Sequence, residues 1–194
     1  MRNRLLTSIL AIIVLQASSI SAYGQCSSGN AMYFDGSPIG RYIQPVVPSN
    51  SIGDNFTIEF WANPTGTITG GMSASNSGFT GTTGQRYVVF PDWYNNTTQA
   101  GVGVSVGTNG VAIIEHAHGH MPASLVHYTS ISGWTHFAIV YTNRTPSLYI
   151  NSALVNPSHG KVQSNRAVYP SSNVGNFIVG GFSFQTYGPY MGYV

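Results

Sequence analysis

Apolar and polar residues alternate along much of the chain, most clearly in the segment 55–64, NFTIEFWANP. Successive side chains of an extended chain point to opposite sides, so an alternating segment has one apolar side and one polar side. Here the first side carries Ile58, Phe60 and Ala62, and the second carries Thr57, Glu59 and Trp61. The pattern predicts a half-buried strand whose pairing ends at Asn63-Pro64, because proline cannot donate to a strand ladder.

Many other short segments are rich in valine, isoleucine, threonine, tyrosine and phenylalanine, which favour strands. Turn clusters such as Thr108-Asn109-Gly110 separate them, and no segment carries the apolar stripe of an amphipathic helix. Successive strands without intervening helices pair antiparallel. We therefore predict an all-β fold, an antiparallel β-sandwich or jelly roll. Its further strands are AMYF, RYIQPVV, RYVVF, GVGVSV, VAIIEH, SLVHYT, WTHFAIVYT, SLYI, ALV, FIVGG and YMGYV.

Composition narrows the classes of protein that fit this pattern. The chain has 194 residues, of which 6% are charged and one is a cysteine. So few charges exclude a coiled coil and a disordered polyelectrolyte, and one cysteine cannot build a disulfide scaffold. The length fits one domain, or one domain preceded by a leader.

Residues 1–24 have the pattern of a signal peptide. A basic start, MRNR, precedes an apolar run at 5–15, which is about half the roughly 20 residues that a membrane-spanning helix needs. The small-residue tripeptide AYG precedes the expected cleavage. We expect residues 25–194 to be the mature domain, secreted or displayed at the cell surface, with no membrane insertion after cleavage.

Loss of this leader would remove Arg2 and Arg4, two of the chain's seven basic residues, and leave five basic against five acidic residues. A chain with no basic excess offers little electrostatic attraction to phosphates or anionic lipids. We therefore expect no nucleic-acid partner.

The segment 65–84, TGTITGGMSASNSGFTGTTG, is rich in glycine, serine and threonine and has no regular apolar period. Such composition favours a loop. We expect a mobile insertion at one end of the sandwich.

Five segments carry a family resemblance through their order and spacing: AMYFDG at 31–36, NFTIEFWANP at 55–64, SGWTHFAIVYT at 132–142, SLYINSALV at 147–155 and FIVGG at 177–181. Over nearly all of residues 31–194 the chain resembles the laminin G-like branch of the concanavalin A-like lectin/glucanase jelly rolls. The resemblance implies two packed antiparallel sheets, with ligands bound on a concave face or at a rim of loops. It names no single function, because this fold carries lectins, adhesion modules, carbohydrate-binding modules and glycosidases.

Two segments depart from the family pattern. The hairpin after LYI carries Asn151-Ser152 where relatives have Asn-Gly, so this turn is expected to be strained or of another type. Relatives continue past a segment such as YMGYV with an acidic, arginine-containing strand, whereas this sequence stops at Val194. The resemblance therefore implies that the final strand is missing and that the domain is C-terminally incomplete.

Two features raise the question of catalysis. The segment GVSVG at 103–107 matches the nucleophile elbow of esterases, but Ser105 lies within an alternating strand and no helix follows, which favours a small side chain on a strand. A glycosidase needs two carboxyl groups about 5 to 9 Å apart, and the five acids of this chain are not clustered in the sequence. Glu59 is better placed to pair with a neighbour such as His136.

Three of the six histidines, His116, His118 and His120, lie within five residues. On one strand they would share a face at spacings of about 6.6 Å, which allows neighbouring imidazoles to converge on a transition metal. Gly119 and Pro122 indicate that the strand ends here. A metal site, a surface that contacts sugar or peptide, and incidental surface histidines all remain open, and we include the three among the candidate ligand-binding residues.

Trp93 and Tyr94, in the predicted loop PDWYNN, form a second candidate ligand patch, because aromatic rings stack on sugars while amides and a carboxylate bond their hydroxyls. Rings that merely cover the sandwich edge are the alternative. Trp61 and Trp134 are predicted to pack in the core or at a strand edge. Asp35, in the turn FDG, either ligates the calcium ion that some relatives bind or caps the turn.

Together these observations predict a secreted, non-enzymatic carbohydrate-binding or adhesion module whose ligand is a glycan or a cell-surface protein. No cofactor is required, although the resemblance allows a calcium ion. Two alternatives stay open: a glycan-active hydrolase of the concanavalin A-like glucanase type, and a structural spacer domain of a larger surface protein.

Overall fold

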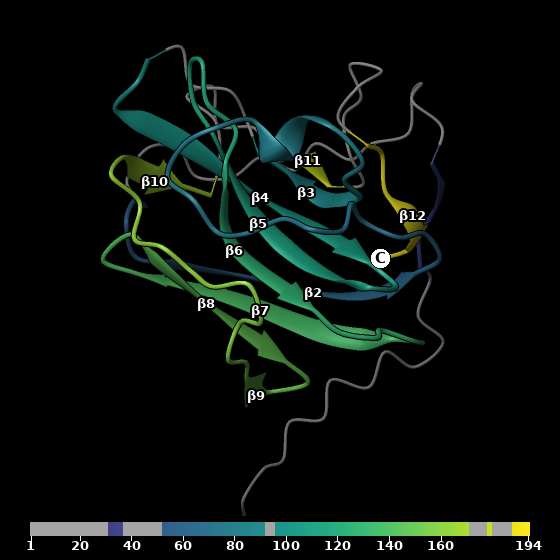
Figure 1. Cartoon of the computed structure of the whole chain (residues 1–194). Coiled ribbons are helices and arrows are strands. Elements are labelled where there is room, and N and C mark those ends of the chain that lie inside the picture. The colour runs from purple at the N-terminus through teal and green to yellow at the C-terminus, as the bar shows by residue number, and fades with distance from the viewer. Residues whose placement is uncertain (1–30, 37–51, 92–95, 171–177, 180–187) are drawn as a thin grey trace, which may run out of the picture. The chain divides into compact units, whose positions relative to one another are not determined.

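The computed structural model describes residues 31–36, 52–91, 96–170, 178–179 and 188–194 (Figure 1). These residues form two β-sheets, and their one helical element is a 3-10 turn, η1 (Thr80–Thr82). No helix in the described ranges has the length and apolar character needed to span a membrane. The predicted all-β sandwich is confirmed. The signal peptide lies outside the described residues and stays a prediction.

The first sheet has six strands in the order β1-β12-β2-β7-β8-β9, all antiparallel. They are β1 (Tyr33–Asp35), β12 (Met191–Tyr193), β2 (Phe56–Pro64), β7 (Thr135–Thr142), β8 (Thr145–Ile150) and β9 (Ala153–Leu154). β12 pairs with β1 on one side and with β2 on the other. The further strand that the resemblance implies after β12 stays a prediction.

The second sheet has the order β11-β3-β4-β5-β6, and β10 pairs with β4 in the parallel direction. Its strands are β3 (Tyr87–Phe90), β4 (Gln99–Gly107), β5 (Gly110–His116), β6 (Ala123–Tyr128), β10 (Ala167–Tyr169) and β11 (Ile178–Val179). Ser105 lies in the middle of β4 with its side chain fully buried, and its hydroxyl oxygen accepts a hydrogen bond from the Arg86 backbone N–H at 2.7 Å. The expectation of a small side chain on a strand is confirmed.

The main core lies between the sheets and follows the predicted alternation. In β2 the apolar side is directed inward, with Ile58 and Ala62 buried and Phe60 half-buried, while Thr57, Glu59 and Trp61 are exposed. β7 alternates in the same way, and the second sheet contributes every other residue of β4 and β5. The residues that line the core from the second sheet include Val102, Val104, Val106, Val111 and Ile113.

A second core covers the outer face of the second sheet. Ile114, Val126 and other residues that face away from the main core pack there against Ile68 and Met72. Ile68 and Met72 are both buried and come from the segment 65–84. The expectation that this segment is a mobile insertion at one end of the sandwich is wrong. The segment has too few apolar residues to show a regular period. The few that it has, Ile68 and Met72, nevertheless pack against the sheet.

Hydrogen bonds fix this covering segment to the sheet. The Asn109 side chain accepts from the Ile68 backbone N–H at 2.8 Å and donates to the Ile68 carbonyl at 2.9 Å. The Tyr87 hydroxyl donates to the Gly81 carbonyl at 2.7 Å, and the Gly81 N–H donates to the Met121 carbonyl at 2.8 Å. Because these backbone groups find partners in the second sheet and in the connections between its strands, the segment is held close to the sheet.

Two tight hairpins join β7 to β8 and β8 to β9. Asn143 and Arg144 form the first turn with φ of 46° and 64°, and Asn151 and Ser152 form the second with φ of 48° and 68°. Positive φ at both central residues is the type I′ pattern, which matches the twist of the strands and favours glycine at the second position. Arginine and serine at that position place strain in both turns, as expected for Asn151-Ser152.

We predict that Gly81→Ala weakens the cover of the second sheet. A methyl group at this position would lie 2.5 Å from Ile114 Cγ2 and 2.8 Å from Met121 Cγ, so the segment must shift. We expect the free energy of unfolding in urea to fall by about 1–3 kcal/mol. Gly70→Ala is the matched control, because a methyl group there meets nothing within 4 Å. Equal stability of the two variants would contradict close packing of the segment.

Candidate functional site

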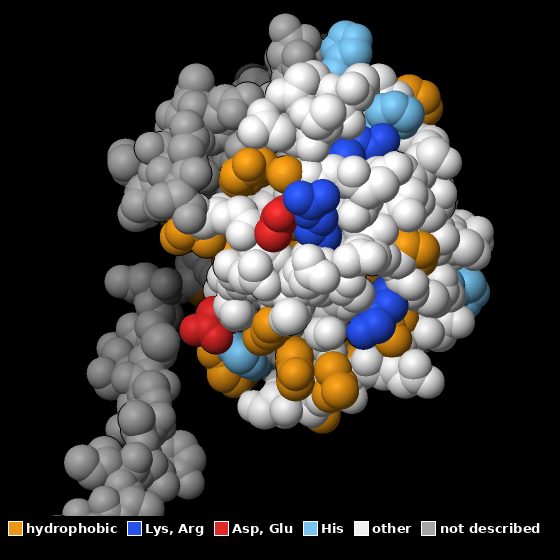
Figure 2. All heavy atoms as spheres, turned by 90° about the vertical axis from the view of Figure 1, so that its left-hand side faces the viewer, with side chains coloured by type: hydrophobic (Ala, Val, Ile, Leu, Met, Phe, Trp, Pro, Cys, Tyr) orange, Lys and Arg blue, Asp and Glu red, His pale blue; other side chains and the backbone are white. Residues whose placement is uncertain are grey.

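Within the described residues no segment covers the outer face of the first sheet, and large apolar side chains gather on it. Of the eight exposed large hydrophobic side chains in the described residues, five stand on this face: Tyr33, Trp61, Trp134, Leu154 and Tyr193. Figure 2 shows hydrophobic side chains around one acidic and one histidine side chain at its lower end, the end at which Figure 1 shows β9. We call this surface the aromatic face. A contiguous apolar surface on a folded domain marks a contact site for a ligand or partner.

The strand register places four residues in a row across the sheet. Tyr33 stands opposite Tyr193, and Tyr193 stands opposite Asn63. Trp134, the residue before β7, continues the row on the other side of Asn63. The ring centroids lie 4.9 Å apart for Tyr33 and Tyr193, and 6.2 Å apart for Trp134 and Tyr193. We call Tyr33, Tyr193, Asn63 and Trp134 the aromatic row.

Beside the row lies an open depression of about 340 Å³, lined by Trp61, His136, Asn151 and Ser152. Trp61 stands opposite His136, and their ring centroids are 5.2 Å apart. The backbone N–H of His136 donates to Asn151 Oδ1 at 3.0 Å, and the N–H of Asn151 donates to the His136 carbonyl at 2.9 Å. These bonds set the strained hairpin turn against the indole. We call this the hairpin depression.

The chemistry of the depression combines an apolar wall with polar groups. An indole face attracts C–H groups, while imidazole, amide and hydroxyl groups exchange hydrogen bonds with hydroxyls. His136 Nε2 also lies 4.0 Å from Glu59 Oε2, so the two side chains are neighbours as expected, at a distance longer than a hydrogen bond. The set suits a ring-shaped ligand with one apolar face and polar edges.

The expectation that Trp61 and Trp134 pack in the core or at an edge is wrong for the core, because their side chains are 56% and 47% exposed. The alternation of β2 already carried the signal, since Trp61 shares its side with Thr57 and Glu59. The hydrophobic character of tryptophan suggested the core, whereas the alternation of inward and outward positions along β2 places the Trp61 ring on the outer side. Trp134 carries the same signal, because in the predicted strand WTHFAIVYT it shares its side with His136 and not with the apolar Phe137.

The three clustered histidines do not form rungs of one strand. β5 ends at His116, and residues 117–120 form a turn in which Ala117 and His120 exchange two backbone hydrogen bonds of 3.0 and 3.1 Å. His116 Nδ1 lies 3.1 Å from the Pro91 carbonyl oxygen. Within the described residues, no three histidine, cysteine or acidic side chains come close enough to hold a metal. A ligand-contacting role for His116, His118 and His120 stays a prediction.

The other candidates are placed less fully. Trp93 and Tyr94 lie outside the described residues, so their patch stays a prediction. Asp35 is exposed at the end of β1, two residues from Tyr33, and takes part in no three-ligand cluster of the described ranges. A calcium ion at Asp35 likewise stays a prediction.

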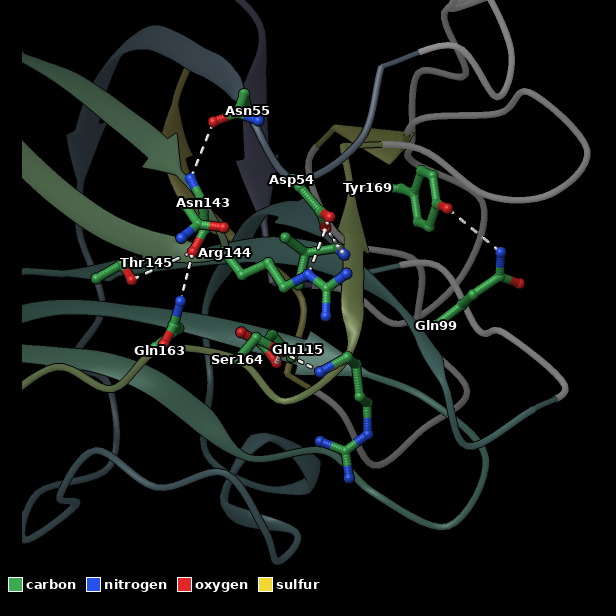
Figure 3. Close-up of polar contacts among 12 residues, drawn as sticks. Asp54, Asn55, Gln99, Glu115, Asn143, Arg144, Thr145, Gln163, Ser164 and Tyr169 are labelled. Atoms are coloured by element: carbon green, nitrogen blue, oxygen red, sulfur yellow. Dashed lines mark hydrogen bonds and ion pairs between the residues drawn. The ribbon is translucent and has the colours of Figure 1, made fainter.

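Sequence analysis missed a buried acid between the sheets. Glu115 is 1% exposed, and it accepts a hydrogen bond from the Ser164 hydroxyl at 2.6 Å (Figure 3). It accepts a second one from the Tyr141 hydroxyl at 3.4 Å. Burial raises the pKa of Glu115, although these hydrogen bonds and the nearby Arg166 charge act in the opposite direction. The alternation of β5 could have revealed this burial, because Glu115 follows Val111 and Ile113 on the inward side of the strand.

The Asp54 side chain also makes its hydrogen bonds within the fold. Its carboxylate accepts from Arg144 Nε at 2.9 Å and from the Val168 backbone N–H at 3.0 Å, while the Arg144 N–H donates to the Asp54 carbonyl (Figure 3). These bonds tie the start of β2 to the β7–β8 turn and to β10. Glu115 and Asp54 therefore stabilise the sandwich and do not face an open site.

Comparisons with known proteins give a likeness in fold. No protein-family model and no curated protein matches the chain. It is similar to the mouse laminin alpha1 chain, domains LG4-5, with 10% identity and a TM-score of 0.43 over 84% of this chain and 38% of the laminin chain. It is also similar to domain 4 of AbnA, a GH43 extracellular arabinanase from Geobacillus stearothermophilus in complex with arabinotriose, with 14% identity and a TM-score of 0.43 over 86% of this chain and 81% of that one.

We predict that Glu115→Gln removes a pH dependence of stability. Because burial raises the folded pKa above 4.5, the folded state holds this proton more tightly, and stability falls as pH rises above that value. The glutamine keeps an oxygen acceptor but does not ionise. We expect the stability of the variant relative to the original chain to increase between about pH 4 and pH 7 in urea unfolding. A pH-independent difference for Glu115→Gln would contradict the raised pKa.

Proposed function

We propose that this protein is a non-enzymatic carbohydrate-binding module that holds its ligand on the aromatic face. The observation that carries the proposal is the hairpin depression, in which the exposed Trp61 stands beside His136, Asn151 and Ser152. A sugar ring presents C–H groups on its face and hydroxyls at its edge. A sugar ring can therefore stack on the indole and exchange hydrogen bonds with the polar groups beside it.

The placement of the other faces supports the same proposal. The inner faces of both sheets form the main core, and the segment 65–84 covers the outer face of the second sheet. The aromatic face is the broad sheet surface that stays open in the described part of the chain. Its rings are directed to solvent without being needed to close the core, so their contact area is available to a ligand.

The placement of the acids favours binding over hydrolysis. A glycosidase sets two carboxyl groups across the scissile bond. Among the described acids, Asp54 is bonded to Arg144, Glu115 is buried, and Asp35 and Glu59 stand on opposite sides of the aromatic row. No second acid lies on the strand rungs that form the depression. An adhesion module that binds protein, a glycan hydrolase and a spacer domain are the competing functions.

We predict that Trp61→Ala weakens glycan binding by about 1–3 kcal/mol, because a stacked ring at the centre of a site contributes most of its energy by direct contact. The full-length chain is first screened on a glycan array, and the bound glycan is then titrated by calorimetry. The melting temperature should stay nearly unchanged, since Trp61 is 56% exposed.

Phe79→Ala is the matched control, because Phe79 is 58% exposed but lies in the segment that covers the other sheet. It should bind like the original chain. Reducing-sugar assays on a polysaccharide panel test for hydrolysis. An empty array, or release of sugar that depends on Glu59, would refute the proposed binding module.

A further inference from the structure

The turn between β8 and β9 holds a serine in a backbone conformation that favours glycine. Ser152 has a φ of 68° and follows Asn151, whose φ is 48°. Asparagine tolerates this left-handed region because its short amide side chain bonds locally, whereas the Cβ of a serine crowds the neighbouring backbone there. Glycine has no Cβ and is the residue that a type I′ turn favours at the second position. Strain of this kind gathers at sites where the residue has a further role.

The preceding hairpin shows such a role. Asn143 and Arg144 have nearly the same torsions, with φ of 46° and 64°. The Arg144 side chain reaches from this turn to Asp54, with Nε 2.9 Å from the carboxylate oxygen Oδ2 (Figure 3). Glycine at position 144 would relax the turn but could not form this ion pair. In the first hairpin, the strained residue is therefore explained by the contact that its side chain makes.

Ser152 lies in a comparable turn, beside the ring that would hold a sugar. It is exposed and lines the hairpin depression together with Trp61. The His136 N–H donates to Asn151 Oδ1 at 3.0 Å, and the Asn151 N–H donates to the His136 carbonyl at 2.9 Å. Trp61 pairs with the same His136 across the strands. His136 therefore joins the indole to the turn, so Ser152 is held at a fixed place in the depression.

The hydroxyl of Ser152 is suited to one hydroxyl of a sugar. A serine hydroxyl donates one hydrogen bond and accepts two, so it can pair with a sugar hydroxyl in either direction. Its side chain is short and loses little freedom when the bond forms. An indole, in contrast, attracts the C–H face of any ring that lies on it. Trp61 therefore supplies affinity for sugar rings in general, whereas a hydroxyl at the edge distinguishes one sugar from another.

Resting on the proposed function, we infer that Ser152 is a specificity-determining residue, whose hydroxyl bonds one ring hydroxyl of the sugar that stacks on Trp61. The strained turn is the condition for this contact, because the glycine that the backbone favours carries no hydroxyl. Stacking fixes the plane of the ring, and the bond to Ser152 fixes its rotation within that plane. The depression therefore selects sugars by the hydroxyl that they present at one carbon.

Two variants separate the hydroxyl from the strain. Ser152→Gly and Ser152→Ala both lose the hydroxyl, but only glycine relaxes the backbone. We expect Ser152→Gly to raise the melting temperature by about 2–4 °C, because relief of the left-handed strain outweighs the greater freedom of the unfolded chain. Ser152→Ala should leave the melting temperature nearly unchanged, since alanine keeps a Cβ at this position.

The binding test uses the methyl glycosides of glucose, galactose, mannose, xylose and arabinose, titrated into the full-length chain by NMR. We expect both variants to bind the preferred glycoside about two- to tenfold more weakly than the original chain, which is the range for loss of one neutral hydrogen bond. Trp61→Ala should weaken every glycoside that binds. Ser130→Ala is the matched control, because Ser130 is an exposed serine of the β6–β7 connection and should bind like the original chain.

Monodeoxy derivatives of the preferred glycoside identify the hydroxyl that Ser152 contacts. In the original chain, the derivative that lacks this hydroxyl should lose about as much affinity as the parent sugar loses in Ser152→Ala. In Ser152→Ala the same derivative should bind like the parent sugar, because the two losses remove one and the same bond. The other derivatives should lose equal affinity in both chains.

Each contrary result has a defined meaning. Undiminished binding by Ser152→Ala, while Trp61→Ala loses it, would overturn the role of Ser152 and leave the proposed function standing. Weaker binding by Ser152→Gly alone would also overturn it, because a more flexible turn and not the missing hydroxyl would be the cause. A deoxy series with equal losses in both chains would show that Ser152 pairs with none of the hydroxyls. Absence of binding to all of these glycosides and to the glycan array would refute both proposals.

Discussion

Burial of both faces of the second sheet determines which surface of the described sandwich stays exposed. β4 and β5 carry small or apolar residues on both sides, so neither side can face water without a cost of about 25 cal/mol per Å² of apolar surface. The first sheet covers one side, and the segment 65–84 covers the other through Ile68 and Met72. The first sheet needs only one covered face, because its outer side mixes polar residues with rings. The open aromatic face follows from this asymmetry.

Buried polar groups then fix how the strands and turns meet. Glu115 lies between the sheets and joins β5 to β7 and to the segment before β10 through Tyr141 and Ser164. Asp54 and Arg144 do the same at the strained turn between β7 and β8. A carboxyl group that is removed from water must keep its hydrogen-bond and charge partners. Glu115 and Asp54 therefore serve to stabilise the fold. Few acids remain for chemistry on the surface.

Local pattern predicted the strands and the class of fold, because side-chain parity in an extended chain is a local property. It also sufficed to place Glu59 beside His136, and it would have placed Trp61 outside and Glu115 inside had parity been weighed above residue type. The covering segment could not be predicted, because Gly81 approaches Met121 and Ile68 meets Asn109 through contacts far apart in sequence. The aromatic row depends on the pairing of β12 between β1 and β2, which no single segment reveals.

The rings of the aromatic face are held by one another before any ligand arrives. Trp61 lies against His136, and Tyr193 lies against both Tyr33 and Trp134, with centroid separations between 4.9 and 6.2 Å. Binding normally loses about 0.5–1.5 kcal/mol for each flexible side chain that it immobilises. Rings that already restrict each other lose less of this freedom, and each has only two side-chain torsions. For the ligand proposed above, the protein side of the contact is therefore largely ordered before binding.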